Sequence, residues 1–349
     1  MRLIFAAGDV GGARALAPVA HLAARSGHQV WVVKHGAIAT DHENQNVIWN
    51  WVDPSFVADN LLTELNPDIV VFASSVTDTM ALELALTAQN KGLPTAHILD
   101  NWSNYAARLV HPSGQRLTPG IYTVMDDLAA QSAVADGLSP NSVVITGTPA
   151  LASVTPQTPH PSGHVIFASE PVSMDQGSDP DKPGYRGYTE DQVLKMLLQE
   201  LQPWADQVDL HVFPHPREDP AGLATILQRH SGRVHTKITP PGEKATVRAA
   251  ARAIVGMSSI LLYDSWLAGL PTLSLQPGLR LPHLRYLEGR PGLFTVDHET
   301  QVATALSQLL GPCSLDHQHS ATHERARHHG ASQRVLTALS DYLRAKANG

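Results

Sequence analysis

The chain has 349 residues, of which 43% are hydrophobic and 16% are charged, and its formal net charge is −7 at pH 7. This composition is typical of a soluble globular protein, and the length predicts two domains. The negative charge argues against a general nucleic-acid-binding protein and against more than peripheral association with anionic membranes. The single cysteine, Cys313, fits a reducing compartment, and no apolar run approaches the roughly 20 residues of a membrane span. We therefore expect a cytoplasmic protein.

The first 153 residues predict an N-terminal, Rossmann-like domain with a parallel sheet. Residues 2–7 have the pattern of a buried strand, residues 8–12 form a glycine-rich turn, and residues 13–26 form a helix rich in alanine and leucine. The alternation of strands and helices then repeats, as in doubly wound folds. The later elements expected here are strands at 29–33, 68–72, 94–99, 121–124 and 142–146, and helices at 79–91 and 126–136.

A second α/β domain is expected after residues 155–163, a stretch without periodicity that is rich in proline and polar residues. We assign residues 164–320 to this domain, and residues 321–349 to a C-terminal helix that packs back across both domains. The fold class is therefore α/β, with two doubly wound domains facing a central cleft. The expected elements are strands at 164–168, 208–213, 253–255 and 272–275, and helices at 190–202, 220–228 and 261–268.

The first turn, Gly8-Asp9-Val10-Gly11-Gly12, invites a dinucleotide-binding interpretation. Its spacing is not G-x-G-x-x-G, and Lys34-His35 follows the second strand where an acidic residue would bind ribose. A structural turn that needs small residues is favoured, and no cofactor is expected. Gly11 and Gly12 are still compatible with an acceptor-binding role, where a substrate approaches the backbone. Asp9 and His35 are candidates for a general base, second to Asp100.

Asp100 ends an apolar strand and is followed by Asn101, Trp102 and Tyr105. Because the carboxyl ends of parallel strands face the ligand crevice, its carboxylate could act as a general base on an attacking hydroxyl. Equally, Asp100 could simply cap the following helix. Trp102 and Tyr105 could form a platform for a sugar ring or could pack at the domain edge. With Asn101 they complete the predicted acceptor-binding set.

Two motifs in the second domain predict a phosphate site. Phe213-Pro214-His215-Pro216-Arg217-Glu218 follows one predicted strand and Gly256-Met257-Ser258-Ser259 follows another. An imidazole and two hydroxyls at strand ends can bind and neutralise a phosphate, although an ordinary histidine and a serine N-cap are the alternatives. Asp264 could accept hydrogen bonds from ribose hydroxyls. The predicted donor-binding residues are His215, Pro216, Ser258, Ser259, Asp264, Ser169 and Glu170.

No metal site is expected. His323-Glu324 is followed by Arg327 where H-E-x-x-H needs a second histidine, and Asp126-Asp127 lacks the D-x-D spacing of metal-dependent sugar transferases. The histidine-rich tail is interpreted as a solvated stretch. Its other histidines are His317, His319, His328 and His329.

As a whole, the chain resembles the GT-B glycosyltransferase superfamily. The likeness includes Gly137-Leu138-Ser139-Pro140 with the strand end at 143–149, and Asp264 followed by Gly269-Leu270-Pro271. More narrowly, residues 99–105, 213–216 and 256–259 resemble the acidic, HP and paired-serine motifs of bacterial sialyltransferases. Asn101 and Trp102 replace the second acidic residue and the glycine of the acidic motif, so the donor or acceptor can differ from theirs.

This resemblance implies an inverting, metal-independent glycosyltransferase that takes a nucleotide-sugar donor and a glycan or other hydroxyl acceptor. The preferred donor is a CMP-linked nonulosonic acid. Asp100 would be the general base, and His215 with Ser258 and Ser259 would stabilise the leaving phosphate. The alternatives are a UDP-sugar transferase, a hydrolysing UDP-sugar 2-epimerase, a CDP-polyol phosphotransferase and a non-catalytic sugar- or nucleotide-binding protein.

Overall fold

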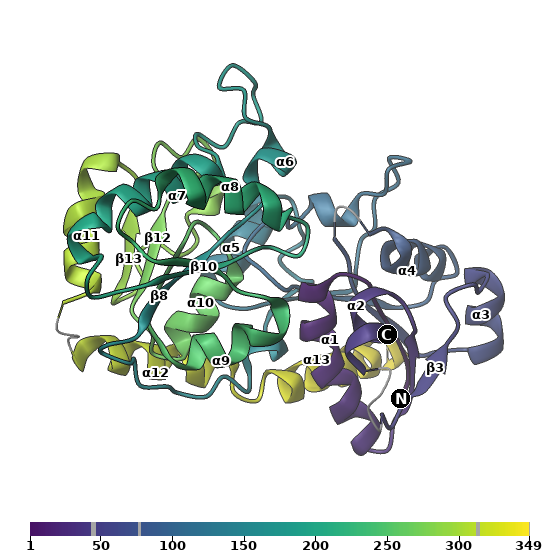
Figure 1. The fold of residues 1–349 in the computed structure, drawn as a ribbon. Coiled ribbons are helices and arrows are strands. Elements are labelled where there is room, and N and C mark those ends of the chain that lie inside the picture. The colour runs from purple at the N-terminus through teal and green to yellow at the C-terminus, as the bar shows by residue number, and fades with distance from the viewer. Residues whose placement is uncertain (43–46, 76–77, 312–314, 349) are drawn as a thin grey trace. The chain divides into compact units, whose positions relative to one another are not determined.

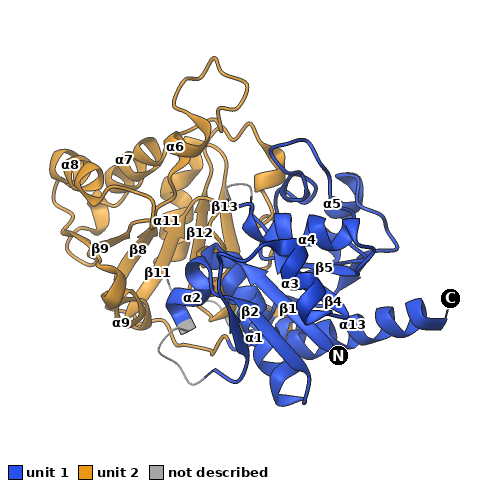
Figure 2. Cartoon of the chain, turned by 90° about the vertical axis from the view of Figure 1, so that its right-hand side faces the viewer, with its two compact units in different colours: residues 1–153, 325–349 blue, residues 154–324 orange. Residues whose placement is uncertain are grey.

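A computed structural model of the chain describes residues 1–42, 47–75, 78–311 and 315–348. It divides into two compact units, each with its own parallel sheet (Figure 2). Unit 1 comprises residues 1–153 and 325–349, and unit 2 comprises residues 154–324. Among the described residues, no helix is long and apolar enough to cross a membrane.

The sheet of unit 1 has seven parallel strands in the order β3-β2-β1-β4-β5-β6-β7. These strands are β1 (Arg2–Ala7), β2 (Gln29–Val33), β3 (Asn50–Val52), β4 (Ile69–Ala73), β5 (Thr95–Ile98), β6 (Ile121–Val124) and β7 (Val143–Ile145). The helices of unit 1 are α1 (Val10–Arg25), α2 (Gly36–His42), α3 (Ala58–Leu65), α4 (Met80–Asn90), α5 (Asp127–Ala135) and α13 (Ala331–Asn348), with short 3-10 helices at Ala107–Leu109 and Pro149–Leu151.

Helices cover both faces of this sheet because its strands are apolar on both sides. Alternate residues of β1, such as Leu3 and Phe5, pack with α1 and α13 in one buried cluster. Their neighbours, such as Ile4, are also fully buried, and α4 lies against β1 and β4. Near-continuous apolar strands of this kind are typical of a parallel sheet between two helical layers.

The sheet of unit 2 has six parallel strands in the order β10-β9-β8-β11-β12-β13. These strands are β8 (His164–Ala168), β9 (Leu210–Phe213), β10 (Thr236–Ile238), β11 (Ala251–Gly256), β12 (Thr272–Leu275) and β13 (Leu293–Val296). The helices are α6 (Val172–Gln176), α7 (Glu190–Glu200), α8 (Pro220–His230), α9 (Lys244–Ala249), α10 (Ile260–Leu267) and α11 (Val302–Leu309), with 3-10 helices at Gln202–Trp204, Pro241–Glu243, Pro282–Leu284 and Glu299–Gln301. Helix α12 (Leu315–His328) contains the boundary between the units.

The helices of unit 2 form two layers around the sheet. Helices α7, α8 and α11 share one buried cluster with the sheet, while α9 and α10 lie on the other side (Figure 1). Helix α7 begins at Thr189, whose hydroxyl accepts the N–H of Gln192 while the Gln192 side chain accepts the N–H of Thr189. This reciprocal capping box fixes where the helix starts.

Both sheets have a topological switch point, where the strand order reverses. In unit 1 the switch point lies between β1 and β4, and in unit 2 it lies between β8 and β11. Open α/β sheets bind their ligands beyond the carboxyl ends of such strands. The doubly wound architecture expected from the sequence is therefore confirmed, and it singles out the loops that begin at Gly8 and Ser74 in unit 1 and at Ser169 and Met257 in unit 2.

The prediction of a single C-terminal helix in residues 321–349 is wrong, because the structure has two helices there, α12 and α13. The break lies at Gly330, whose φ of +74° falls in the left-handed region that ends helices and favours glycine. Arg334 donates hydrogen bonds to the carbonyls of Thr146 and His329, which fixes the start of α13 within unit 1.

Candidate functional site

Asp9 lies at the switch point of unit 1, directly after β1. Its side chain caps α1 by accepting the N–H of Gly12 at 3.3 Å. Burial, together with the nearby Asp100 carboxylate, raises the pKa of Asp9 to about 6, while the Arg108 guanidinium opposes the rise. A carboxyl group with such a pKa can both give and take a proton near neutral pH.

Asp100, after β5, is held in a buried ion pair. Its Oδ1 accepts Nη1 of Arg108 at 2.7 Å, and the side chains of Asp100 and Arg108 are 9% and 4% exposed. Arg108 also donates to the Ser74 carbonyl and to the Asn101 side chain. The interpretation of Asp100 as a helix cap is wrong, because the next helical element starts only at Ala107 and the carboxylate faces the arginine instead.

Gly11 and Gly12 make room for these two carboxylates. A Cβ atom on Gly11 would lie 2.1 Å from Oδ2 of Asp100, and one on Gly12 would lie 2.6 Å from Oδ1 of Asp9. Gly8 does the same for a third acidic group, because its Cβ would lie 1.4 Å from Oδ2 of Asp78. The glycines of the first turn therefore serve the packing of acidic side chains, which agrees with the structural interpretation of the turn.

The aromatic residues expected to form a sugar platform are buried. Trp102 is 1% exposed, and its indole N–H donates to both carboxylate oxygens of Asp126 at 3.0 and 2.9 Å. Tyr105 is 5% exposed, and burial raises its pKa to about 12. Their placement favours the packing alternative, since neither ring offers an open face. Asn101 accepts hydrogen bonds from both the N–H and the hydroxyl of Ser103, so it orders this loop.

His35 follows β2, which flanks β1 on the side opposite β4. Its Nε2 is 3.0 Å from Oδ2 of Asp78, a residue of the loop after β4. Asp78 is a further charge that raises the pKa of Asp9. The carboxyl ends of β1, β2, β4 and β5 thus bring three acidic residues, a histidine and an arginine to one edge of unit 1.

In unit 2, His215 follows β9. Its Nδ1 accepts the N–H of Arg217 at 3.2 Å, so the neutral ring carries its proton on Nε2. Burial lowers the pKa of His215, and the charge of Arg217 lowers it further. The ring is therefore neutral at neutral pH and can donate one hydrogen bond to an anion. Glu218 fixes the loop by accepting the His215 N–H and the Ser169 hydroxyl, both at 2.6 Å.

Ser258, after β11, is already bonded to an anionic side chain. Its N–H and its hydroxyl donate to the carboxylate of Glu170, at 2.5 and 2.8 Å. Arg186 donates to Glu170 at 3.2 Å and to the Ser258 hydroxyl at 3.1 Å. The structure thus brings Ser258 and Glu170 of the predicted donor set together, and adds an arginine to them.

Two further residues of the predicted donor set, Ser259 and Asp264, have structural partners. The Ser259 hydroxyl caps α10 by accepting the N–H of Leu261, which is the serine N-cap alternative. Asp264 is 4% exposed and forms two hydrogen bonds with Arg248, at 3.0 and 3.2 Å. Pro216 is exposed beside His215.

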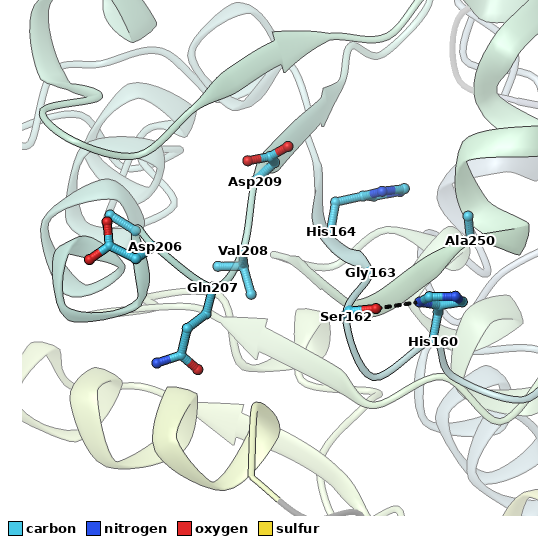
Figure 3. A pocket seen from close by; sticks show the side chains of 10 residues that line it. His160, Ser162, Gly163, His164, Asp206, Gln207, Val208, Asp209 and Ala250 are labelled. Atoms are coloured by element: carbon cyan, nitrogen blue, oxygen red, sulfur yellow. Dashed lines mark hydrogen bonds between the residues drawn. The ribbon is translucent and has the colours of Figure 1, made fainter.

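A surface cavity of about 380 Å³ lies at the opposite edge of the unit 2 sheet. Figure 3 shows His160, His164, Asp206 and Asp209 among its lining residues. His164 begins β8 and Asp209 precedes β9, so this cavity is at the amino ends of strands whose carboxyl ends carry Ser169 and His215. It is therefore distinct from the predicted donor site.

Within the described part of the chain, no group of three or more histidine, cysteine, aspartate and glutamate side chains could hold a metal ion. His328, of the histidine-rich tail, is buried and its Nδ1 accepts the N–H of Thr148. Cys313 and the side chains of His317 and His319 lie outside the described residues.

Sequence reasoning missed Arg108, Arg186 and Asp78. Arg108 lies in the short 3-10 helix Ala107–Leu109 and Arg186 lies in a loop, both without periodicity, and Asp78 precedes α4 without a motif around it. The arginines could have been predicted from one rule: a carboxylate that is expected to be buried needs a cationic partner.

Comparison with known proteins relates the chain to solved structures by fold. No protein-family model matches this sequence, and neither does any curated protein. One similar structure is described as a UDP-N-acetylglucosamine 2-epimerase from Listeria monocytogenes, with 14% identity, a TM-score of 0.70, and coverage of 99% of this chain and 97% of the other. A second, the UDP-GlcNAc 2-epimerase from Neisseria meningitidis bound to UDP-GlcNAc, has 12% identity, a TM-score of 0.68, and coverage of 98% and 100%.

A third similar structure is a glycosyltransferase from Rickettsia africae, with 9% identity, a TM-score of 0.64 and coverage of 98% of both chains. The chain therefore has the GT-B fold shared by these enzymes, which confirms the predicted fold class. None of the three is described as a sialyltransferase or in terms of CMP, so the narrower resemblance gains no support from them.

Proposed function

We propose that this protein acts on a UDP-linked sugar and breaks the bond between its anomeric carbon and UDP, as a hydrolysing UDP-sugar 2-epimerase. The observation that carries the proposal is the pair Asp9 and Asp100 at the switch point of unit 1, in which the pKa of Asp9 is raised to about 6. UDP is preferred to CMP because similar structures of the same fold are described as UDP-GlcNAc 2-epimerases, one of them with UDP-GlcNAc bound.

The acidic pair suits the proton transfers of 2-epimerisation. A base removes the proton at C2 while the C1–O bond breaks, which releases UDP and leaves an unsaturated sugar. Water then adds at C1 and a proton returns to C2, so UDP-sugar and water become UDP and the free epimeric sugar. Asp9, which can hold or release a proton near neutral pH, is the better proton carrier, since Oδ1 of Asp100 is already bonded to Arg108.

The nucleotide is proposed to bind at the switch point of unit 2. The neutral His215 would donate from Nε2 to a phosphate oxygen, and Ser258 and Arg186 would supply an N–H, a hydroxyl and a guanidinium. Such charge-assisted hydrogen bonds can carry the developing charge of the leaving phosphate.

A glycosyltransferase is the second candidate. It is supported by the order of the acidic, HP and paired-serine motifs along the chain, and by the fold similarity to the Rickettsia glycosyltransferase. In that case Asp9 or Asp100 would take the proton of an acceptor hydroxyl, and the C2–H bond of the donor would stay intact.

Incubation with UDP-GlcNAc in D₂O, with EDTA present, tests the proposal. We expect release of UDP and of a free sugar that carries deuterium at C2, detected by proton NMR. CMP-, CDP- and GDP-linked sugars serve as matched donors and should stay intact. Release of UDP with C2–H retained, and only when an acceptor is present, would favour the transferase. Turnover of a CMP-linked sugar alone would contradict the choice of nucleotide.

A further inference from the structure

The carboxylate of Glu170 occupies the place in unit 2 where the proposed function puts a phosphate. Its Oε1 accepts the Ser258 N–H at 2.5 Å, and its Oε2 accepts the Ser258 hydroxyl at 2.8 Å and Nη1 of Arg186 at 3.2 Å. Glu170 comes from the loop after β8 and Ser258 from the loop after β11, the two strands that flank the switch point. An anionic group is therefore already seated on the donors that a nucleotide phosphate would use.

These donors are held in place by partners other than Glu170. The Arg186 Nε donates to the Gln176 side chain at 2.6 Å, and the carbonyl of Ser258 accepts the hydroxyl of Tyr286. The preceding carbonyl, of Met257, accepts the Ser274 hydroxyl at 2.5 Å. The arginine and the serine would thus keep their positions if the carboxylate left, which is the property of a preorganised anion site.

We propose that Glu170 is an intramolecular competitor for the phosphate of the nucleotide, and that binding requires the phosphate to displace it from Ser258 and Arg186. This inference rests on the proposed nucleotide site in unit 2. The two anions repel each other and need the same donors, so both cannot be bound at once. The Glu170 side chain is 13% exposed, so part of it already reaches the surface from which water can solvate it.

Displacement makes the charge of the ligand decisive. A nucleotide phosphate offers more negative charge and more acceptor oxygens than a carboxylate, so it can replace Glu170 on the arginine. A nucleoside without phosphate has no anionic group that could replace the Glu170 carboxylate on Ser258 and Arg186. Glu170 therefore lowers the affinity of phosphate-bearing ligands and leaves that of uridine unaffected, and it neutralises the buried Arg186 when the site is empty.

Titration calorimetry of the whole protein with UDP, UMP and uridine tests this inference. In Glu170→Gln the amide cannot bind Arg186 as an anion, so the phosphate has no charged competitor. We expect UDP and UMP to bind about tenfold or more tightly than to the wild type, the value of a charge-assisted hydrogen bond, and uridine affinity to stay unchanged. UDP should also raise the Tm of Glu170→Gln more than that of the wild type.

Glu190→Gln is the matched control. Glu190 likewise accepts the N–H and hydroxyl of a serine, Ser173, but has no arginine in that contact. Its UDP affinity should equal that of the wild type. If the wild type binds UDP and Glu170→Gln binds it equally or more weakly, Glu170 only supports the local structure or contacts the ligand directly. The inference is then wrong, and the proposed nucleotide site is unaffected. If neither protein binds UDP or UMP, the site and the inference fail together.

Discussion

At the scale of single residues, Asp9 is the group on which the proposed chemistry depends most. Its pKa of about 6 predicts that kcat/KM of the wild type falls as the pH drops below about 6, where the carboxyl group becomes protonated and cannot act as a base. Asp9→Asn should lower kcat by about 10²-fold or more and remove this acidic limb. If the variant keeps full activity and the acidic limb of its pH profile is unchanged, another residue transfers the proton.

The same pKa has a consequence for folding. Since burial raises the pKa of Asp9 from 3.8 to about 6, the folded state binds this proton more tightly than the unfolded state. This tighter proton binding contributes to the free energy of unfolding. The contribution is fully present below about pH 4 and is lost as the pH rises through about 6, and the loss is about 3 kcal/mol at most. Asp9→Asn keeps the cap of α1 and should be more stable than the wild type at pH 7.5, by about 1–3 kcal/mol, and nearly equal to it at pH 4. Urea unfolding at both pH values measures this difference, and an equal effect at both would contradict the assigned pKa.

Asp100 combines the catalytic role proposed for it with a structural role in a buried ion pair. Asp100→Asn would leave the 4%-exposed Arg108 without its charged partner, so we expect a loss of about 1–3 kcal/mol in the free energy of unfolding and a fall in kcat of about 10²-fold or more, with UDP affinity unchanged. Asp175→Asn is the control, because its ion pair with Arg217 is about half exposed and contributes little. A variant of Asp100 with wild-type stability would contradict the buried ion pair.

Sequence patterns identified Asp9, Asp100 and His215 but missed the two buried arginines, Arg108 and Arg186. Asp100, His215 and Ser258 follow apolar strands, and the rule for parallel sheets places such residues at the ligand-binding edge. Arg108 comes from a one-turn 3-10 helix and Arg186 from a loop, and neither segment carries a periodic signal. Their positions depend on tertiary packing, which local patterns do not encode.

At the scale of elements, the turn between β1 and α1 needs glycine at position 11. Gly11→Ala would put a Cβ atom 2.1 Å from Oδ2 of Asp100, so the carboxylate or the turn must shift. We expect a loss of about 1–3 kcal/mol in the free energy of unfolding and a marked fall in kcat. Gly222→Ala in α8 is the control, because nothing lies within 4 Å of its Cβ and alanine favours a helix. Normal stability and activity of Gly11→Ala would show that Asp100 is not confined as described.

The elements that the sequence predicted best are the apolar strands and the helices next to them. β1, β8 and α10 start and end within one residue of their expected limits, and α1 ends within one residue of its limit but starts three residues earlier. Hydrophobic periodicity and glycine turns mark these elements. The short edge strands β3, β10 and β13 were missed, since each has only three or four residues. The break at Gly330 was also missed, because one glycine in a polar helix is a weak signal.

At the scale of the whole molecule, we propose that unit 2 binds the nucleotide and unit 1 transfers the protons. A crystal structure of the protein with UDP tests this assignment most directly. We predict density for the phosphates at Ser258, Arg186 and His215, with Glu170 displaced from Ser258. UDP bound only at the Gly8–Gly12 turn of unit 1 would contradict the account.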